Sequence, residues 1–253
     1  MWATCRYGIM TLQLTPMETD KEKKERKGRD KIEVSMPMSR SEMHTSILKR
    51  IDRIDMEFRE GFKFLERFPR SVTIFGSSLT AEDNPYYKKA TSLTKRIASE
   101  LDRSIITGGG PGIMEAANRG AFEAEGHSLG ITIKLPDVQP TNIYLTNQIG
   151  LQYFFARKVC LSFSSNVFIF FPGGYGTLDE LFEILTLVQT KKIKSVPVIL
   201  FGSEYWKPFE KFLEENILSR GMIDHNDMSL FTIEDDENKI LEIIKNAPER
   251  NEY

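Results

Sequence analysis

Residues 172–180 read Pro-Gly-Gly-Tyr-Gly-Thr-Leu-Asp-Glu, between the apolar run 167–171 and the amphipathic run 181–188. This order predicts a buried strand that ends in a glycine turn and is followed at once by a helix. Such a turn directs backbone N–H groups and the positive end of a helix dipole toward one point, which suits a phosphate. Glu180 lies one helical turn further on, so a carboxylate is expected beside the anion site.

The same alternation extends on both sides of this stretch. Strand patterns occupy 72–75, 104–107, 129–135, 167–171, 196–201 and 228–232, and helical patterns occupy 85–101, 113–125, 152–161, the segment from the motif to about 190, 206–217 and 235–246. Alternating strands and helices favour a mainly parallel sheet with helices on both faces. We therefore predict an α/β fold, a three-layer Rossmann-like domain.

The N-terminal part of the chain has a different character. Residues 1–40 contain an alternating charge run and little periodicity, so we expect a disordered tail. Residues 41–67 carry apolar residues at spacings of three and four, which predicts an N-terminal helix. The rest of the 253 residues suffices for one core, and we expect 41–253 to form a single nucleotide-binding domain.

Three predicted strands end in glycine-rich turns, at 76–78, 108–112 and 173–176. Tight strand-to-helix turns use glycine without any ligand, so one such turn is weak evidence for a site. Four glycines within 108–112 exceed what a plain turn requires, and the carboxyl ends of parallel strands share one edge. Together the turns favour a phosphorylated small molecule at that edge.

Composition excludes several classes of function. The formal net charge of −2 gives no reason to expect nucleic acid, and no apolar run approaches the length of a membrane span. The three histidines are scattered and Cys5 and Cys160 lie far apart, so we expect no metal and no disulfide. Cys160 is expected to be a buried thiol in a cytoplasmic protein.

The familiar nucleotide signatures are absent. No lysine follows the glycines as a P-loop requires, and Thr107 stands where a dinucleotide-binding strand ends in an acidic residue. A mononucleotide or a sugar phosphate therefore fits better than NAD or hydrolysis of ATP.

Residues 108–117 (Gly-Gly-Gly-Pro-Gly-Ile-Met-Glu-Ala-Ala), the motif at 172–180 and the Arg157-Lys158 pair resemble the LOG family. That family comprises cytokinin riboside 5′-monophosphate phosphoribohydrolases and related nucleotide nucleosidases, long mislabelled lysine decarboxylases. The resemblance covers about residues 71–244 and leaves the N-terminal extension outside. It implies hydrolysis of the N-glycosidic bond of a nucleoside 5′-monophosphate to free base and ribose 5-phosphate, with Arg157 and Glu180 as the catalytic pair and no cofactor.

The residues admit several roles within this chemistry. Glu180 can stabilise the positive charge of an oxocarbenium-like transition state, hold the ribose hydroxyls or orient water, whereas alone it would be an ordinary helix-start carboxylate. Arg157 can bind the phosphate, steady Glu180 or assist the leaving base, or it can cover Phe154 and Phe155 at the surface. The remaining candidate substrate-binding residues are Gly76, Ser77, Ser78, Gly109, Gly110, Gly112, Met114, Lys158, Gly173, Gly174, Gly176, Thr177 and Glu183.

One alternative stays open at this level, and a second is discounted. Molybdenum-cofactor carriers are similar in fold and glycine turns, which leaves a non-catalytic nucleotide- or cofactor-binding protein as the second hypothesis. A pyridoxal-dependent decarboxylase lacks a marked Schiff-base lysine here. Apolar faces on residues 47–65 and on the helix after Thr177 favour a homodimer or a higher homo-oligomer.

Overall fold

The computed structural model describes residues 38–134 and 141–248. Nearly all of the expected tail, residues 1–37, lies outside the described residues, as does Cys5. The chain divides into two units between residues 46 and 47, and of the first unit the structure describes only residues 38–46. In the first unit, Ser39 and Glu42 form a capping box: the Ser39 backbone N donates to Glu42 Oε2 at 2.8 Å, and the Glu42 backbone N donates to Ser39 Oγ at 3.3 Å. This box starts the helix α2 (Arg40–Glu66), which continues into the second unit.

The second unit is built around a parallel sheet, which confirms the predicted α/β class. Its strands are β1 (Ser71–Phe75), β2 (Ser104–Thr107), β3 (Ser128–Ile133), β4 (Asn147–Leu151), β5 (Val167–Phe170), β6 (Val198–Leu200) and β7 (Thr232–Ile233). They lie in the order β4-β3-β2-β1-β5-β6-β7, and every pair among the described strands is parallel. In register, Val72 of β1 lies between Ile105 of β2 and Val167 of β5.

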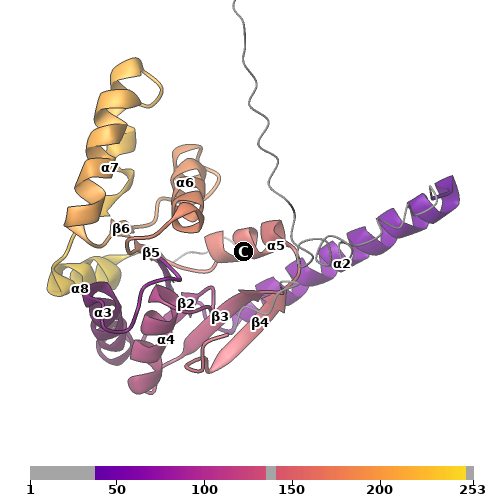
Figure 1. The fold of residues 1–253 in the computed structure, drawn as a ribbon, viewed down its shortest axis with the longest axis horizontal. Helices are drawn as coiled ribbons and strands as arrows, with labels where there is room; N and C mark the ends of the chain where they lie inside the picture. Colours follow the sequence, from indigo (N-terminus) through magenta and orange to yellow (C-terminus); the bar gives the residue numbers. More distant parts are fainter. Residues whose placement is uncertain (1–37, 135–140, 249–253) are drawn as a thin grey trace, which may run out of the picture. The chain divides into compact units, whose positions relative to one another are not determined.

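Helices cover both faces of this sheet. They are α3 (Pro85–Leu101), α4 (Ile113–Glu123), α5 (Phe154–Ser162), α6 (Tyr175–Gln189), α7 (Ser203–Asn216) and α8 (Glu237–Asn246). One core joins the sheet to α3, α4 and α8, which lie close together in Figure 1, and the other joins it to α5, α6 and α7 and to the C-terminal turns of α2. The result is the predicted three-layer arrangement.

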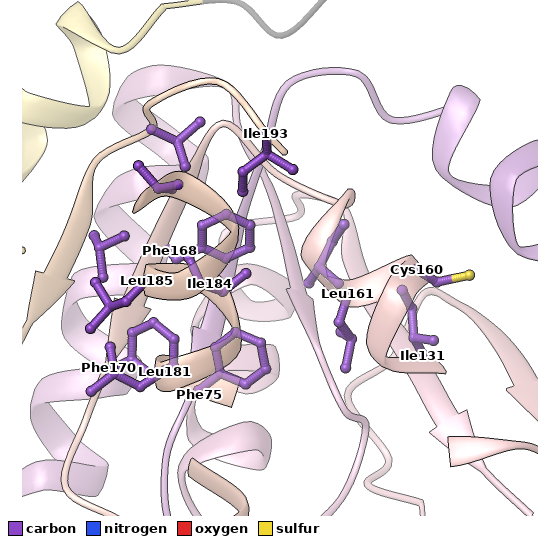
Figure 2. Packing of buried hydrophobic residues seen from close by; sticks show 14 of the residues in the cluster. Phe75, Ile131, Cys160, Leu161, Phe168, Phe170, Leu181, Ile184, Leu185 and Ile193 are labelled. Atoms are coloured by element: carbon purple, nitrogen blue, oxygen red, sulfur yellow. The ribbon is translucent and has the colours of Figure 1, made fainter. Parts of the chain in front are cut away.

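Alternation along β5 shows why these residues form a fully buried strand. Phe168 and Phe170 enter the core beneath α6, whereas Val167 and Ile169 enter the core on the opposite face. Figure 2 shows Leu181, Ile184 and Leu185 of α6 packed over the two phenylalanines. Each such apolar side chain stabilises the fold by about 1.5–3 kcal/mol when it is buried away from water. The packing of α6 on β5 is therefore the main interaction that holds these two elements together. Cys160 is a free, buried thiol, as predicted.

The topology fixes where a ligand can bind. From β1 the chain proceeds to β2, β3 and β4 on one side, and from β5 it proceeds to β6 and β7 on the other side. The strand order therefore reverses between β1 and β5, and the carboxyl ends of strands at such a switch point border a crevice. Two of the three glycine turns follow these two strands directly.

The secondary structure differs from expectation at two places. The strand β4 was not predicted, because Asn147-Gln148-Ile149-Gly150-Leu151 is polar and contains glycine, as suits an edge strand. The strand predicted at 228–232 is wrong, since His225–Leu230 forms a 3₁₀ helix and only Thr232–Ile233 is a strand. A capping box between Asp224 and Asp227 begins a helical turn there and overrides the β propensity.

In the described part of the chain, no helix has both the length and the apolar character that crossing a bilayer requires.

Candidate active site

The three glycine turns meet at the switch point. Ser77, just after β1, donates its backbone N–H to the carbonyl oxygen of Pro172 at 3.0 Å. The carbonyl oxygen of the same residue accepts the backbone N–H of Ile113, the first residue of α4, at 3.0 Å. The turn after β1 is therefore hydrogen-bonded to both of the other turns, and the expected meeting of the three is observed.

These turns border a cavity of about 430 Å³. α5 and α6 contribute Phe154, Arg157, Lys158, Asp179 and Glu180 to its wall. The glycine turns and the first residues of α4 and α6 contribute Gly76, Ser77, Ser78, Leu79, Gly108, Gly109, Gly110, Met114, Gly174, Tyr175, Gly176 and Thr177, and the remainder is Phe75, Thr132, Ile133 and Thr141. This volume suits a small ligand such as a mononucleotide.

The glycines of the motif fall into two groups. A Cβ on Gly173 would overlap the side chain of Thr177 and lie 3.0 Å from the Ser77 backbone nitrogen, so the packing of the turn requires glycine there. The hydroxyl of Tyr205 also donates to the Gly173 carbonyl oxygen at 2.6 Å and braces this position. A Cβ on Gly174 or Gly176 would meet no atom within 4 Å, although both residues line the cavity. The fold therefore does not require glycine at these two positions.

The N-terminus of α6 faces this open space. Its N-cap residue is Gly174, and no side chain caps the helix. The first N–H groups of a helix have no partner within it and carry the positive end of the dipole. The arrangement suits an anion, and Thr177, which is buried at the cavity wall, adds a hydroxyl group.

Arg157 is held in place by a hydrogen bond to the strand β3. Its Nε atom donates to the carbonyl oxygen of Ile131 in β3 at 2.8 Å, and a Cβ on Gly108 would overlap its Nη2 atom. The guanidinium therefore lies directly against the turn after β2. Burial lowers the pKa of Arg157, whereas the charge of Glu180 opposes that shift. The side chain is thus a fixed donor at the cavity wall, not a surface arginine.

Glu180 is a buried carboxyl group that faces the cavity. Its side chain is 7% exposed, and its Oε2 atom has no hydrogen-bond partner within the described residues. Burial raises the pKa of Glu180 to about 7, while the positive charges of Lys158 and Arg157 act in the opposite direction. A carboxyl group of this kind exchanges its proton near neutral pH, which suits acid–base chemistry.

Lys158 links α5 to α6 beside this carboxyl group. Its Nζ atom lies 2.9 Å from Asp179 Oδ2 and 2.8 Å from Glu183 Oε2. Burial opposes the charged form of Lys158, but the bonds to Glu183 and Asp179 outweigh it and raise its pKa. Lys158 therefore neutralises the two acids next to Glu180, a role that sequence spacing alone does not reveal.

A buried polar network supports the turn after β2. Asn118 of α4 accepts from Thr107 Oγ1 at 2.6 Å and from Asn142 Nδ2 at 3.0 Å. Asn142 also donates its backbone N–H to the carbonyl oxygen of Gly109 and its side-chain amide to that of Gly110. Gly109 itself has a φ of +73°, which favours glycine. The network fixes this wall of the cavity without a ligand.

The structure brings most of the expected site residues to one cavity. Gly112, Gly173 and Glu183 do not line it: Gly112 packs against the Ser77 and Ser78 backbone, Gly173 shapes the motif turn, and Glu183 pairs with Lys158. Met114, expected to bind substrate, does line it, as does Phe154, whereas the neighbouring Tyr153 does not. Sequence reasoning did not predict Thr132, Ile133 and Thr141 as cavity residues, because they belong to no motif. Thr132 and Ile133 line the cavity from the strand β3, and Thr141 lines it from a loop.

Among residues 38–134 and 141–248, no group of three His, Cys, Asp or Glu side chains is placed to hold a metal ion. The absence of a metal from the reaction remains a prediction from sequence.

Residues 114–244, just over half of the chain, match the protein-family model described as "Possible lysine decarboxylase". The chain belongs to this family. It is the LOG family of the sequence resemblance, and its curated members among the relatives bear the name of a phosphoribohydrolase.

LOG-family relatives are similar over part of the chain. Cytokinin riboside 5′-monophosphate phosphoribohydrolase LOG5 of Arabidopsis thaliana is 33% identical over 124 residues, which are 49% of this chain and 54% of LOG5. The match therefore spans about half the length of that relative. The phosphoribohydrolase of Rhodococcoides fascians is 26% identical over 148 residues, 58% of this chain and 75% of that protein.

Solved structures support the fold. The molybdenum cofactor carrier protein of Chlamydomonas reinhardtii is 25% identical with a TM-score of 0.52 and covers 70% of this chain and 96% of its own. The molybdenum cofactor binding protein of Rippkaea orientalis, at 21% identity and a TM-score of 0.51, is similar in fold alone. The chain is therefore similar in sequence to proteins named phosphoribohydrolases and similar in fold to proteins named for the molybdenum cofactor.

Proposed function

We propose that this protein hydrolyses the N-glycosidic bond of nucleoside 5′-monophosphates and releases a free base and ribose 5-phosphate. The proposal rests on one juxtaposition above all. An uncapped helix N-terminus, with sterically free glycines at 174 and 176, borders the same cavity as the buried carboxyl group of Glu180. An anion site supports the 5′-phosphate, and a carboxyl group one helical turn away supports chemistry at the ribose.

The chemistry follows from the charges that develop. As the bond between C1′ and the base nitrogen breaks, its electron pair leaves with the base and positive charge develops on the sugar. The Glu180 carboxylate stabilises that charge in a site where burial strengthens electrostatic interactions. Water then bonds to C1′ and releases a proton, which a group with a pKa of about 7 accepts near neutral pH. The base, which leaves with the electron pair of the broken bond, takes up one proton from solvent, so that one water is consumed for each free base and ribose 5-phosphate formed.

Arg157 supplies the complementary positive charge. Because Nε is occupied by Ile131, its Nη atoms remain to meet an anionic or electron-rich part of the substrate. The names of the LOG-family relatives support a phosphoribohydrolase, and they favour a cytokinin riboside monophosphate or a related purine nucleotide as substrate.

Base release from a nucleotide panel tests the proposal. AMP, GMP, CMP and N6-isopentenyl-AMP are incubated with the protein, and free base and ribose 5-phosphate are separated by chromatography. We expect release from at least one nucleotide, loss of turnover in Glu180→Gln, and unchanged activity in Glu215→Gln, whose side chain is 61% exposed on α7 and does not line the cavity. No release of any base by folded protein that binds ribose 5-phosphate would refute the proposal.

A second candidate is a carrier that binds a nucleotide or the molybdenum cofactor without turnover. The structural similarity to the Chlamydomonas reinhardtii carrier supports it. The buried carboxyl group of Glu180 has no evident task in a carrier, so we favour the hydrolase. A pterin or nucleotide that copurifies with the protein, identified by mass spectrometry, together with no base release would reverse this preference.

We further propose that two or more copies associate. Phe154 and Phe155 of α5 and Phe182 of α6 are exposed by 57%, 44% and 42%, which is unusual for three large aromatic residues on neighbouring helices. Sedimentation equilibrium is expected to give a homodimer or a higher homo-oligomer, and a monomer at micromolar concentration would contradict this. A cytoplasmic location remains a prediction based on the scarcity of cysteine.

A further inference from the structure

The helix α5, which carries Arg157, begins without a cap from its own sequence. Its N-cap residue is Tyr153, whose side chain makes no capping hydrogen bond. Instead the Glu57 carboxylate, on α2, accepts the backbone N–H of Gln152 at 2.8 Å and that of Tyr153 at 3.1 Å. A residue 95 positions away in sequence thus accepts the N–H groups of the N-cap residue and of the residue before it, as the N3 side chain of a capping box accepts the N-cap N–H.

Glu57 is buried at this contact, and both of its carboxylate oxygens are hydrogen-bonded. Its side chain is 7% exposed, although most of its neighbours on α2 are exposed. Burying a carboxylate is costly unless it is hydrogen-bonded, and here each oxygen accepts one backbone N–H at the positive end of a helix. The contact is therefore a specific one that fixes the start of α5 and not a surface charge that happens to lie near it.

Further contacts hold the two helices side by side. The rings of Phe58 and Phe155 lie 6.5 Å apart, and those of Phe62 and Phe163 lie 6.0 Å apart. Between these pairs, a Cβ at Gly61 would overlap the Cys160 sulfur atom, so the helices approach closely at this point. Glu57 caps α5 at one end of a continuous contact, and α2 cannot rotate about its axis without breaking it.

A short path leads from this cap to the cavity. The backbone N–H of Arg157 donates to the carbonyl oxygen of Tyr153 at 3.1 Å, in the first turn of α5. The guanidinium of the same residue is fixed by Ile131 and faces the cavity with Glu180. The position of the first turn of α5 therefore determines where the charge of Arg157 lies relative to Glu180.

We propose that Glu57 is a positioning residue for the active site: by capping α5 it holds Arg157 in register with Glu180. The inference rests on the proposed function, because it assigns Glu57 to the same reaction. It also assigns a task to α2, which precedes the segment 114–244 that matches the family model. The part of the chain outside that match then contributes to the geometry of the site.

The test compares Glu57→Ala and Glu57→Gln with Glu60→Ala, a matched control on the exposed side of α2. The alanine variant removes both acceptors, and the glutamine variant keeps one and places a donor against the second N–H. With a nucleotide that wild-type protein cleaves, we expect kcat to fall about 10- to 100-fold in Glu57→Ala and less in Glu57→Gln. Glu60→Ala should keep the wild-type kcat.

A second readout does not depend on turnover. The titration of Glu180 is followed by carboxyl ¹³C NMR, with its resonance identified by its loss in Glu180→Gln. The charge of Arg157 lowers the pKa of Glu180, so displacement of Arg157 should move the titration midpoint upward in Glu57→Ala and leave it unchanged in Glu60→Ala. A loss of thermal stability alone would not cause this movement.

The outcomes separate the two proposals. If wild-type protein cleaves a nucleotide and Glu57→Ala retains both kcat and the Glu180 midpoint, the positioning role is overturned and the proposed function stands. If wild-type protein cleaves none but the midpoint moves in Glu57→Ala only, the positioning stands and the proposed reaction falls. Should Glu57→Ala fail to fold, the same two measurements on Glu57→Gln decide the matter.

Discussion

The Nε atom of Arg157 donates a hydrogen bond to the carbonyl oxygen of Ile131 at 2.8 Å. This bond ties the helix α5 to the strand β3, and the guanidinium lies against Gly108. A long, flexible side chain is thereby held in one orientation before any substrate arrives. Such preorganisation reduces the entropy that binding and catalysis would otherwise have to overcome.

Arg157→Lys tests whether this orientation matters. A lysine has one ammonium group, which cannot both bond to Ile131 and extend over Gly108 as the forked guanidinium does. We expect kcat/KM for the preferred nucleotide to fall about 100-fold, which is about 2.7 kcal/mol of transition-state stabilisation. The control is Arg119→Lys, a surface arginine paired with Glu82 and Glu123. Activity within twofold of wild type in Arg157→Lys would show that only charge is needed.

Gly176→Ala tests whether glycine at this position is required for binding phosphate and not for folding. A methyl group at this position meets nothing within 4 Å, and alanine is favoured over glycine in a helix by up to about 1 kcal/mol. The melting temperature should therefore stay equal or rise, whereas binding of ribose 5-phosphate, measured by calorimetry, should weaken at least tenfold. Unchanged binding would place the phosphate elsewhere.

Gly173→Ala is expected to behave in the opposite way. Its Cβ would overlap Thr177 and crowd the Ser77 backbone, so the turn must shift. We expect a loss of about 1–3 kcal/mol in the free energy of unfolding by denaturant titration, typical of overpacking at a tight site. A fully stable Gly173→Ala would mean that the motif turn is looser than the structure indicates.

Glu180 should make stability depend on pH. Its pKa is raised from the ordinary 4.5 to about 7 in the folded chain, so the folded form holds this proton more tightly than the unfolded form. The stabilisation by the proton is fully present below about pH 4.5 and is lost as the pH rises through 7. The free energy of unfolding of Glu180→Gln, measured relative to that of wild type, should therefore increase by on the order of 2–3 kcal/mol between pH 4 and pH 8.

The measurement is the free energy of unfolding of both proteins at several pH values, because the difference cancels the other titrating groups. Glu60→Gln, at an exposed position on α2, provides the control. If the difference in free energy of unfolding between wild type and Glu180→Gln does not change with pH, Glu180 ionises with its ordinary pKa.

The rate of base release should depend on the same ionisation. If the Glu180 carboxylate stabilises the sugar cation and accepts the proton of water, kcat/KM should rise as the pH passes through about 7 and then level off. Lys158→Gln removes a nearby positive charge that lowers the pKa of Glu180. The rise of kcat/KM should therefore occur at higher pH in this variant. A rate that falls above pH 7 would instead make Glu180 the acid that protonates the leaving base.

The order of apolar runs and glycine turns predicted the fold and most of the cavity. The strands β1, β2, β3, β5 and β6 each have their own apolar run, and the turns after β1, β2 and β5 carry their own glycines, so the signal is local in sequence. The same reasoning failed at β4, because an edge strand needs no apolar run. It failed again at residues 228–232, where the capping of a short helix by Asp224 outweighed β propensity.

For the site as well, sequence predicted some features and only the folded structure determined others. Motif spacing was enough to single out Glu180 and the glycine turns, because strand-to-helix turns at one sheet edge must converge. Arg157 was singled out only by the resemblance to the LOG family. The partners of these residues depended on packing: Ile131 for Arg157, Asp179 and Glu183 for Lys158, and Glu57 for α5. Nothing adjacent in sequence distinguishes Glu57 from other acids of its helix. Only the folded chain, by burying one helix against another, determines which carboxylate meets an open helix end.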